Sequence, residues 1–170
     1  MSKEKMTSVK NSDVKKTILL TGATGFLGSH LLSALLEEGH KVIVLKRSTS
    51  NLVRINHLMD DIVVYDIDKY PLDDIFAHES FEAVIHVATS YSREQQNELD
   101  IVDTNIVLGI NLLKSASKHG VRIFINTDTF FNNDNLLARH MQSYTLSKKQ
   151  FIEWLKYFSF SVFHFQFFIS

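Results

Sequence analysis

The chain has 170 residues, of which 45% are hydrophobic and 22% charged, a balance typical of a globular protein that can bury one sizeable core. Its formal net charge of -1 offers no positive field for nucleic acid, which we therefore exclude as a partner. The absence of cysteine excludes disulfides, thiolate metal sites and cysteine nucleophiles, and the eight histidines lack a metal-binding spacing, so we expect no metal site.

The first sixteen residues are polar and lysine-rich, and they lack the apolar segment of a signal peptide. We expect residues 1–16 to be a mobile leader and residues 17–170 to form one domain. No apolar run approaches the roughly 20 residues that a membrane-spanning helix needs. The sequence therefore predicts no membrane contact and a cytoplasmic location.

Short apolar runs rich in Val and Ile alternate with longer amphipathic stretches along the rest of the chain. This alternation predicts an α/β fold, a doubly wound parallel sheet with helices on both faces. We expect about six strands, at residues 17–21, 41–46, 62–67, 82–88 and 121–127, and near 158–168. We expect helices at about 25–38, 100–119 and 140–157, with a weaker one near 72–78.

The segment TGATGFLGSH places Gly22, Gly25 and Gly28 between the first strand and the first helix. A phosphate-binding turn needs one glycine where the chain reverses, one where backbone touches a pyrophosphate, and one where helix and strand pack closely. Ser29 and His30 follow the last glycine where a nucleotide triphosphatase would have Lys-Ser/Thr, which argues against that class. A tight glycine-rich turn without a ligand is the alternative interpretation.

The spacing in TGATGFLGSHLL resembles the opening of the extended short-chain dehydrogenase/reductases, the NAD(P)-dependent epimerase/dehydratase family. Later segments match the family in the same order, namely YDI at 65–67, HVAT at 86–89, NIVLGINLLKSA at 105–116, INTDT at 125–129 and YTLSK at 144–148. The resemblance covers essentially residues 17–168. It implies a Rossmann-type fold in which the glycine turn holds a dinucleotide.

The resemblance also implies which residues contact the cofactor. In the turn these are Gly22, Thr24, Gly25, Phe26, Leu27 and Gly28. Asp66 and Ile67 would border the adenine ring, and Val87, Ala88 and Thr89 would line the pyrophosphate and ribose. Asn105 would support the active-site strand from the long predicted helix; an orientation toward solvent is the alternative.

The end of the second strand distinguishes NADP from NAD, because a carboxylate there repels a 2′-phosphate. This strand ends in Lys46 and Arg47 and carries no acid. Arginine can bind phosphate through two parallel N–H bonds, so NADP(H) is the favoured cofactor and NAD(H) the second candidate. The alternative is that both cations are solvated residues at a strand end.

Tyr144 and Lys148 are candidates for proton transfer, since the cofactor carries only the hydride. Their spacing in a predicted helix places both side chains on one face. We expect the cation of Lys148 to lower the pKa of Tyr144, normally about 10, and to reach the ribose hydroxyls. An exposed tyrosine beside a solvated lysine is the alternative. Trp154 and Leu155 are expected to follow on the core side.

By the resemblance, Thr127 is the third catalytic residue and hydrogen-bonds the substrate hydroxyl. Asp128 stands where related dehydratases keep a general acid, but Thr129 replaces the glutamate that follows it. Elimination of water thereby loses one of its two acid-base groups. Carbonyl reduction or epimerisation is favoured over dehydration.

The segments NTDTF and YTLSKKQFIEWL resemble those of reductases that make CDP-linked 3,6-dideoxyhexoses with NADPH. The expected substrate is therefore a nucleotide-linked 4-keto sugar. Family members are longer, so we expect the C-terminal substrate-binding part to be missing, and a catalytically inactive fragment that keeps dinucleotide binding is the alternative. The helices near 100–119 and 140–157 are candidates for a homodimer interface.

Overall fold

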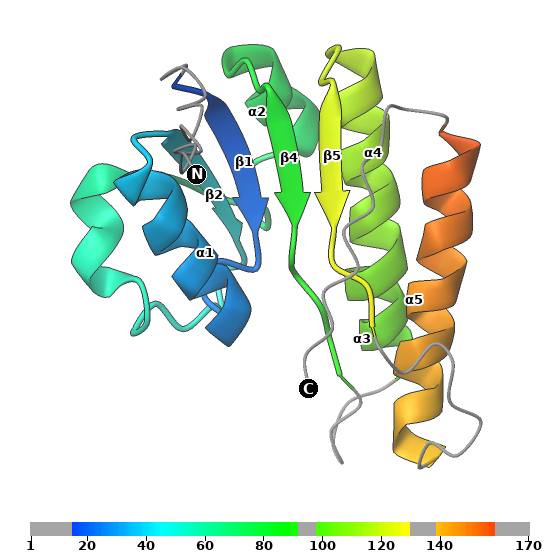
Figure 1. The fold of residues 1–170 in the computed structure, drawn as a ribbon. Coiled ribbons are helices and arrows are strands. Elements are labelled where there is room, and N and C mark those ends of the chain that lie inside the picture. Colours follow the sequence, from blue (N-terminus) through cyan, green and yellow to red (C-terminus); the bar gives the residue numbers. More distant parts are fainter. Residues whose placement is uncertain (1–14, 92–97, 130–138, 159–170) are drawn as a thin grey trace, which may run out of the picture.

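The computed structural model describes residues 15–91, 98–129 and 139–158 (Figure 1). Strands and helices alternate along these ranges as the sequence predicts. In chain order they are β1 (Thr17–Thr21), α1 (Phe26–Glu37), β2 (Lys41–Lys46), the 3-10 helix η1 (Asn56–Asp61), β3 (Val63–Asp66), α2 (Leu72–His78), β4 (Ala83–His86), α3 (Glu98–Val102), the π-helical turn η2 (Asp103–Val107), α4 (Leu108–Lys118), β5 (Ile123–Asn126) and α5 (Arg139–Tyr157).

The described strands form one parallel sheet in the order β3-β2-β1-β4-β5. β1 lies in the middle, because Thr17 pairs with Lys41 of β2 on one side and Ile18 pairs with Ala83 of β4 on the other. The predicted doubly wound Rossmann-type fold is thereby confirmed. In such sheets ligands bind outside the carboxyl ends of the strands where the strand order reverses, which here is between β1 and β4.

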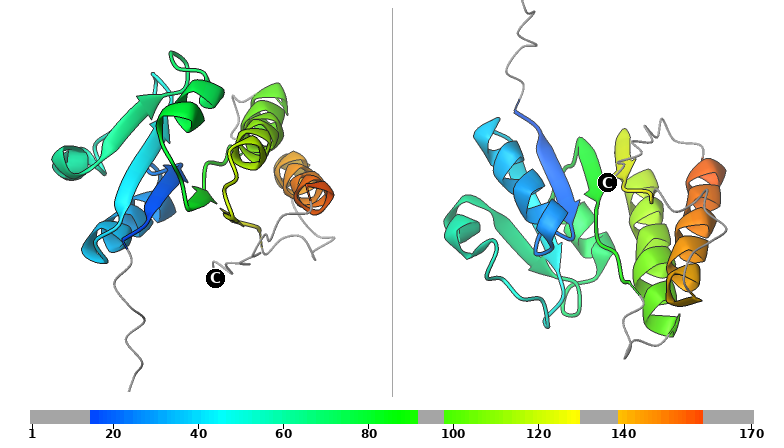
Figure 2. Two further views of the ribbon diagram at one scale, coloured as in Figure 1. Left: turned by 90° about the horizontal axis from the view of Figure 1, so that it is seen from above. Right: turned by 60° about the horizontal axis from the view of Figure 1, so that its bottom comes forward.

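Two hydrophobic layers enclose the sheet, and Figure 2 shows the helices that lie beside it. α1 and η1 cover one face, and α2, α4 and α5 cover the other. Successive residues of β1 serve both layers, since Ile18 and Leu20 pack toward α1 whereas Leu19 packs toward α4. Burial on both faces explains why the strands read as continuous apolar runs instead of alternating ones.

The helix predicted at 100–119 consists of three consecutive segments, α3, η2 and α4. The π-helical turn η2 accommodates an extra residue, and such turns often occur at functional sites. Within it Asn105 is buried. The apolar periodicity of the sequence could not reveal this turn, because the residues on either side keep a helical pattern. The helix η1 is also absent from the sequence-based prediction.

α4 and α5 are in direct contact at Gly109, where a Cβ atom would collide with the ring of Phe151. Phe151 and Leu155 are buried. The prediction that Trp154 faces the core is wrong, because its side chain is 41% exposed. Trp154 precedes Leu155 by one residue, so it lies about 100° around the helix from the buried face.

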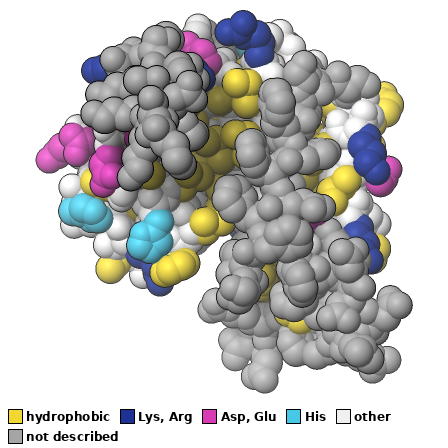
Figure 3. Space-filling model, in the orientation of Figure 1, with side chains coloured by type: hydrophobic (Ala, Val, Ile, Leu, Met, Phe, Trp, Pro, Cys, Tyr) yellow, Lys and Arg dark blue, Asp and Glu magenta, His cyan; other side chains and the backbone are white. Residues whose placement is uncertain are grey.

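Parts of two predictions fall outside the described residues, namely 1–14 of the leader and 159–168 of the sixth strand. Among the described helices, none combines the length and apolar composition needed to cross a membrane. On the face shown in Figure 3, the described Lys and Arg side chains are scattered instead of gathered in one patch.

Candidate functional site

The glycine turn brings the start of α1 against the carboxyl ends of β1 and β4. Gly22 has a φ of +73°, and a Cβ atom there would lie 2.5 Å from the amide nitrogen of Ala88. A Cβ atom on Gly28 would collide with the carbonyl oxygen of Gly22. Both clashes involve backbone, which cannot give way, so this turn requires glycine at both positions.

The first turn of α1 is suited to an anion. The helix has no side-chain cap and no acidic residue in its first turn, whereas the first turn of α2 contains Asp73 and Asp74. The early amide N–H groups of a helix have no partner within it, and they carry its partial positive charge. With the close glycine backbone, this end of α1 fits the pyrophosphate of a dinucleotide.

A groove of about 860 Å³ runs along the carboxyl edge of the sheet. It contains both the glycine turn and the predicted catalytic residues. The predicted residues that line it are Gly22, Thr24, Gly25, Phe26, Leu27, Gly28, Lys46, Arg47, Ile67, Val87, Ala88, Thr89, Thr127, Tyr144 and Lys148. Asp66 and Asn105 are not among the lining residues. Each forms a hydrogen bond with a residue that is, namely Lys46 for Asp66 and Thr89 for Asn105.

Asp66 binds Lys46 and so changes the predicted charge at the end of β2. Its Oδ2 accepts hydrogen bonds from Ser48 Oγ at 2.7 Å and from Lys46 Nζ at 3.2 Å, and Oδ1 accepts from the amide of Asp68 at 3.1 Å. The hydrogen bond from Ser48, followed by those from Asp68 and Lys46, lowers the pKa of Asp66. Lys46 is therefore paired with a carboxylate. The expectation that both Lys46 and Arg47 are available for a 2′-phosphate is corrected to Arg47 alone of these two.

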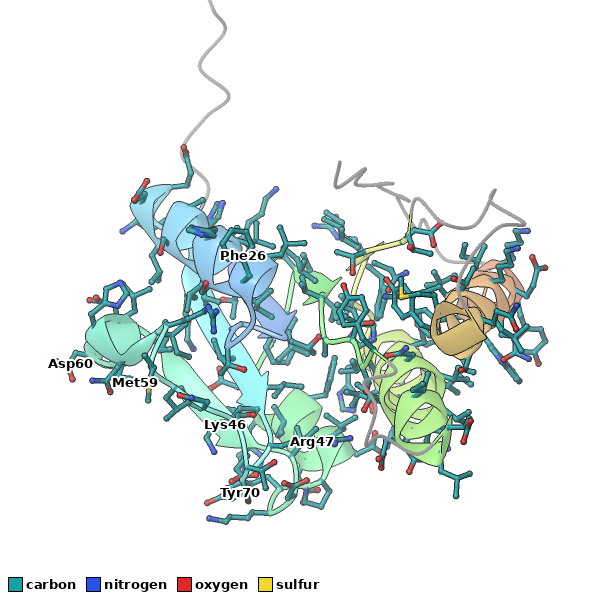
Figure 4. The ribbon with its side chains drawn as sticks, turned by 90° about the horizontal axis from the view of Figure 1, so that it is seen from below. Phe26, Lys46, Arg47, Met59, Asp60 and Tyr70 are labelled. Carbon is teal, nitrogen blue, oxygen red and sulfur yellow. The ribbon has the colours of Figure 1, made fainter. Side chains whose placement is uncertain are left out.

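Arg47 and Arg54 are the cations that face this end of the groove without a carboxylate partner among the described residues. Arg47 extends from the end of β2 and donates to the hydroxyl of Thr104 in η2 at 3.2 Å (Figure 4). Arg54 lies in the loop after β2. The sequence-based prediction missed Arg54, because no strand or helix end marks its position. Its distance of seven residues from Arg47 was the only available signal.

Asn105 connects three segments with its side-chain amide. Its Oδ1 accepts from the Ser90 amide at 2.7 Å and from Thr89 Oγ1 at 3.2 Å. Its Nδ2 donates to the Ser90 carbonyl and to Ser147 Oγ, each at 2.9 Å. Ser147 in turn donates to the carbonyl of Tyr144 at 2.7 Å. Asn105 thus faces the interior and fixes the loop after β4 to the part of α5 that contains Tyr144 and Ser147.

Two of the three predicted catalytic residues, Thr127 and Lys148, are in contact at the end of β5, and Tyr144 lines the same groove. Lys148 is buried, and its Nζ donates to the carbonyl of Thr127 at 2.9 Å. The Thr127 hydroxyl reaches the carbonyl of His86 at 3.5 Å, a long contact that leaves it adjustable. Tyr144 lines the same groove from α5. The alternative of an exposed tyrosine beside a solvated lysine is excluded by the burial of both.

The pKa of Tyr144 is raised and not lowered as the spacing with Lys148 led us to expect. Burial is the main cause, and the neighbouring Tyr91 adds to it, whereas a hydrogen bond with the Thr129 side chain acts in the opposite direction. Lys148 is not among the main causes of this shift, and its Nζ donates to the Thr127 carbonyl. Burial lowers the pKa of Lys148 itself to about 8. Tyr144 is accordingly a neutral phenol at ordinary pH.

His86 and Thr21 form a buried pair beneath the groove that the sequence-based prediction missed. Thr21 Oγ1 accepts from the amides of Val87 and Ala88 at 3.2 Å, so its own proton is available for His86 Nδ1 at 2.8 Å. This pattern places the imidazole proton on Nε2. Burial, and secondarily the charge of Lys148, lower the pKa of His86 to about 3. The pair is neutral and joins the ends of β1 and β4.

No group of three or more His, Asp or Glu side chains that could hold a metal ion occurs within residues 15–91, 98–129 and 139–158.

Comparison with known proteins identifies the family. The model of the NAD dependent epimerase/dehydratase family matches residues 18–161, and the chain belongs to this family. A CDP-abequose synthase of Salmonella muenchen is 36% identical over 141 residues, covering 83% of this chain and 47% of that enzyme. A UDP-glucose 4-epimerase of Schizosaccharomyces pombe is 31% identical over 119 residues, covering 64% of this chain and 34% of that enzyme.

Solved structures show the same fold. The enzyme WbmH of Bordetella bronchiseptica in complex with NAD+ superposes with a TM-score of 0.74 at 23% identity, over 90% of this chain and 56% of that one. The UDP-glucose 4-epimerase of Thermotoga maritima, solved with UDP-glucose, gives 0.74 at 24% identity, over 88% and 54% of the two chains. This chain thus spans about half the length of the curated relatives and solved structures that it matches.

The buried Lys148 should make stability depend on pH. Its folded-state pKa of about 8 lies below the ordinary 10.5, so protonation destabilises the folded chain below pH 8, and this penalty fades as the pH rises toward 10.5. We expect Lys148→Met to have a higher free energy of unfolding than the original chain at pH 7. At pH 10 this advantage should be smaller by roughly 1–3 kcal/mol, as measured by urea unfolding. Lys149→Met, at an exposed position, is the control. Equal differences at both pH values would contradict the burial of a titrating Lys148.

Proposed function

We propose that this member of the NAD dependent epimerase/dehydratase family is an NADP-dependent oxidoreductase that reduces the 4-keto group of a nucleotide-linked sugar. The observation that carries the proposal is the single groove, in which a buried neutral Tyr144 lies near the end of β5 and the glycine turn lies at the end of β1. The similarity to a CDP-abequose synthase supports a CDP-linked dideoxyhexose as the substrate. Epimerisation is the second reaction to consider.

The protonation state of Tyr144 favours reduction over epimerisation. NADPH, when bound, supplies a hydride to the carbonyl carbon. In this scheme Tyr144 donates its phenolic proton to the carbonyl oxygen, and the Thr127 hydroxyl hydrogen-bonds that oxygen. Lys148 keeps the Thr127 backbone in place. Epimerisation begins with removal of a hydroxyl proton, for which a phenol with a raised pKa is poorly prepared.

The preference for NADP is supported by Arg47 and Arg54. Both line the groove, and Arg47 directly follows the end of β2, where a 2′-phosphate would be bound. Among the described residues, the Arg47 guanidinium hydrogen-bonds a neutral hydroxyl and no carboxylate, so little is lost when it turns to a phosphate. Lys46 contributes long-range attraction at most, because Asp66 neutralises it.

A second candidate function is dinucleotide binding without turnover. The matched part covers 47% of the Salmonella muenchen enzyme, so the activity of that whole enzyme does not carry over directly to the described residues. Binding of the cofactor and oxidation of the cofactor must therefore be measured separately.

The proposal includes a homodimer that packs through the helices near 100–119 and 140–157. Several large apolar side chains on these helices are exposed, namely Leu99, Val102, Val107, Leu146, Trp154 and Tyr157. A second copy would bury such side chains, and the favourable free energy grows with the apolar area removed from water.

Removal of either arginine should weaken the binding of NADPH more than the binding of NADH. A hydrogen bond to a charged group contributes about 1.5–3 kcal/mol, so we expect Arg47→Ala and Arg54→Ala each to lower NADPH affinity about 10- to 100-fold. Affinity for NADH should change less than about threefold, as it lacks the 2′-phosphate. Fluorescence titration with both cofactors measures this, with the exposed Arg122→Ala as the control. Equal losses for NADH and NADPH would refute a phosphate site.

Tyr144→Phe should separate turnover from binding. Because a general acid contributes about 10²- to 10⁴-fold, we expect NADPH oxidation with a CDP-linked 4-keto sugar to fall by at least about 100-fold. NADPH affinity should remain within about threefold, since the ring is kept. The exposed Tyr157→Phe serves as the control. If the original chain binds NADPH but oxidises it with no 4-keto sugar nucleotide, the reductase proposal fails and the binding function stands.

The homodimer can be tested by sedimentation equilibrium. Charges in an apolar interface are costly to bury, so Leu146→Glu and Trp154→Glu should shift the chain toward monomer, raising the dissociation constant at least about tenfold. Val53→Glu introduces the same charge at an exposed apolar residue outside these helices and should have no effect. A chain that is monomeric before substitution would exclude the dimer.

A further inference from the structure

The end of β2 places an ammonium group beside the arginine that is proposed to bind a 2′-phosphate. Lys46 Nζ donates to the backbone carbonyl of Arg47 at 3.2 Å, and both residues line the groove. A second positive charge therefore lies next to Arg47. What this charge can contribute to cofactor binding depends on Asp66, the carboxylate with which it is paired.

The Lys46–Asp66 ion pair is largely shielded from water. Oδ2 of Asp66 lies 3.2 Å from Lys46 Nζ, and the two side chains are only 10% and 17% exposed, respectively. Lys69 approaches the same oxygen at 3.8 Å, but its side chain is 68% exposed, so solvent screens that second pair. Lys46 is consequently the main ionic partner of Asp66.

Asp66 is held in place by hydrogen bonds that involve the loop after β2. Ser48, the residue after Arg47, donates its hydroxyl to Oδ2 of Asp66 at 2.7 Å and its amide to Oδ2 of Asp68 at 2.8 Å. The amide of Asp68 donates to Oδ1 of Asp66 at 3.1 Å. These bonds, that from the Ser48 hydroxyl first, lower the pKa of Asp66, so its carboxylate is ionised at neutral pH. The fold thus builds a negative charge in beside the loop that carries Arg47.

A carboxylate at this position acts on the two cofactors unequally. It repels a 2′-phosphate, and it also occupies an ammonium group that could otherwise bind that phosphate. NADH lacks the 2′-phosphate, so neither effect lowers its affinity to the same extent. The carboxylate therefore works against Arg47, which favours NADPH.

We propose that Asp66 limits the preference of this chain for NADPH over NADH, because its carboxylate keeps Lys46 from the 2′-phosphate and adds a negative charge near it. The inference rests on the proposed preference for NADP and concerns binding alone. With Arg47 on the phosphate and Lys46 on Asp66, NADPH keeps an advantage and NADH remains a second cofactor.

The first test compares both cofactors in Asp66→Asn, which keeps the shape of the side chain and one oxygen acceptor. A shielded ammonium that has lost its carboxylate gains more from a phosphate than a paired one does. We expect the ratio of NADPH affinity to NADH affinity, measured by fluorescence titration, to rise about 3- to 10-fold. The ratio is used because Asp66 is also expected to border the adenine ring, which both cofactors share.

Asp73→Asn is the matched control. Asp73 likewise pairs with a lysine, since its Oδ2 lies 2.8 Å from Lys118 Nζ, but it belongs to α2 and is not among the residues that line the groove. The ratio in this variant should equal that of the original chain. A ratio that stays the same or falls in Asp66→Asn overturns the proposal.

The second test introduces Lys46→Met with and without Asp66→Asn. In the original chain we expect the ratio to fall less than about threefold, because the ammonium is already paired and acts on the phosphate only at long range. In Asp66→Asn the same substitution should lower the ratio at least about threefold more. Equal falls in both chains, or a larger fall from Lys46→Met alone, overturn the proposal. If Asp66→Asn does not fold, Lys46→Met alone decides.

These titrations need no sugar, so they separate this inference from the proposed function. If NADPH binds but is not oxidised with any 4-keto sugar nucleotide, the reductase function fails and the role of Asp66 is still decided by the ratios. A chain that prefers NADPH only after Asp66→Asn would contradict the proposed cofactor preference and support the role of Asp66. Absence of binding of either cofactor, in the original chain and in the variants, would overturn both.

Discussion

The end of the groove that carries Tyr144 and Lys148 depends on one buried side-chain amide, that of Asn105. All four of its hydrogen bonds go to segments that form the groove, namely the loop after β4 and the middle of α5. A buried amide that lost these partners would incur a cost of about 1–3 kcal/mol for each polar group left unsatisfied. The arrangement therefore has few alternatives of similar energy. The π-helical turn η2 is what brings Asn105 inward to this position.

The two ends of the groove differ in their electrostatic environment. At the end of β2 the chain keeps charge exposed on Arg47, while Asp66 pairs with Lys46 and Lys69. At the end of β5 the chain buries a lysine and a tyrosine, and burial is the main cause that moves both pKa values toward the neutral forms. Dinucleotide phosphates suit the first environment, and a proton donor suits the second. The separation follows from where the strands end and which helices cover them.

The sequence predicted the fold well because it is encoded locally. Apolar runs at the strands, the amphipathic α1 and the glycine spacing each carry their own signal, and the structure contains all of them. The lining of the groove was also largely predicted, since strand ends in a parallel sheet gather at one edge. What could not be predicted depends on the direction of side chains. Examples are the Lys46–Asp66 ion pair, the hydrogen bond from Lys148 to the Thr127 carbonyl and the packing of Tyr91 on Tyr144. The separation of these residues in the sequence does not reveal how their side chains are oriented. The exposed Trp154 was misjudged for a related reason, as one helical position separates it from the buried face.

The contact of Gly109 with Phe151 lies close to the candidate catalytic residues on α5. Gly109 lies four residues after Asn105 on one helix, and Phe151 lies three residues after Lys148 on the other, so each is about one turn away. α5 is therefore attached to its neighbour at two points along its axis, by hydrogen bonds through Ser147 and by the ring of Phe151. One attachment would allow the helix to roll about its axis, whereas two fix its rotation. The direction in which Tyr144 points is thus set mechanically by the pair of helices.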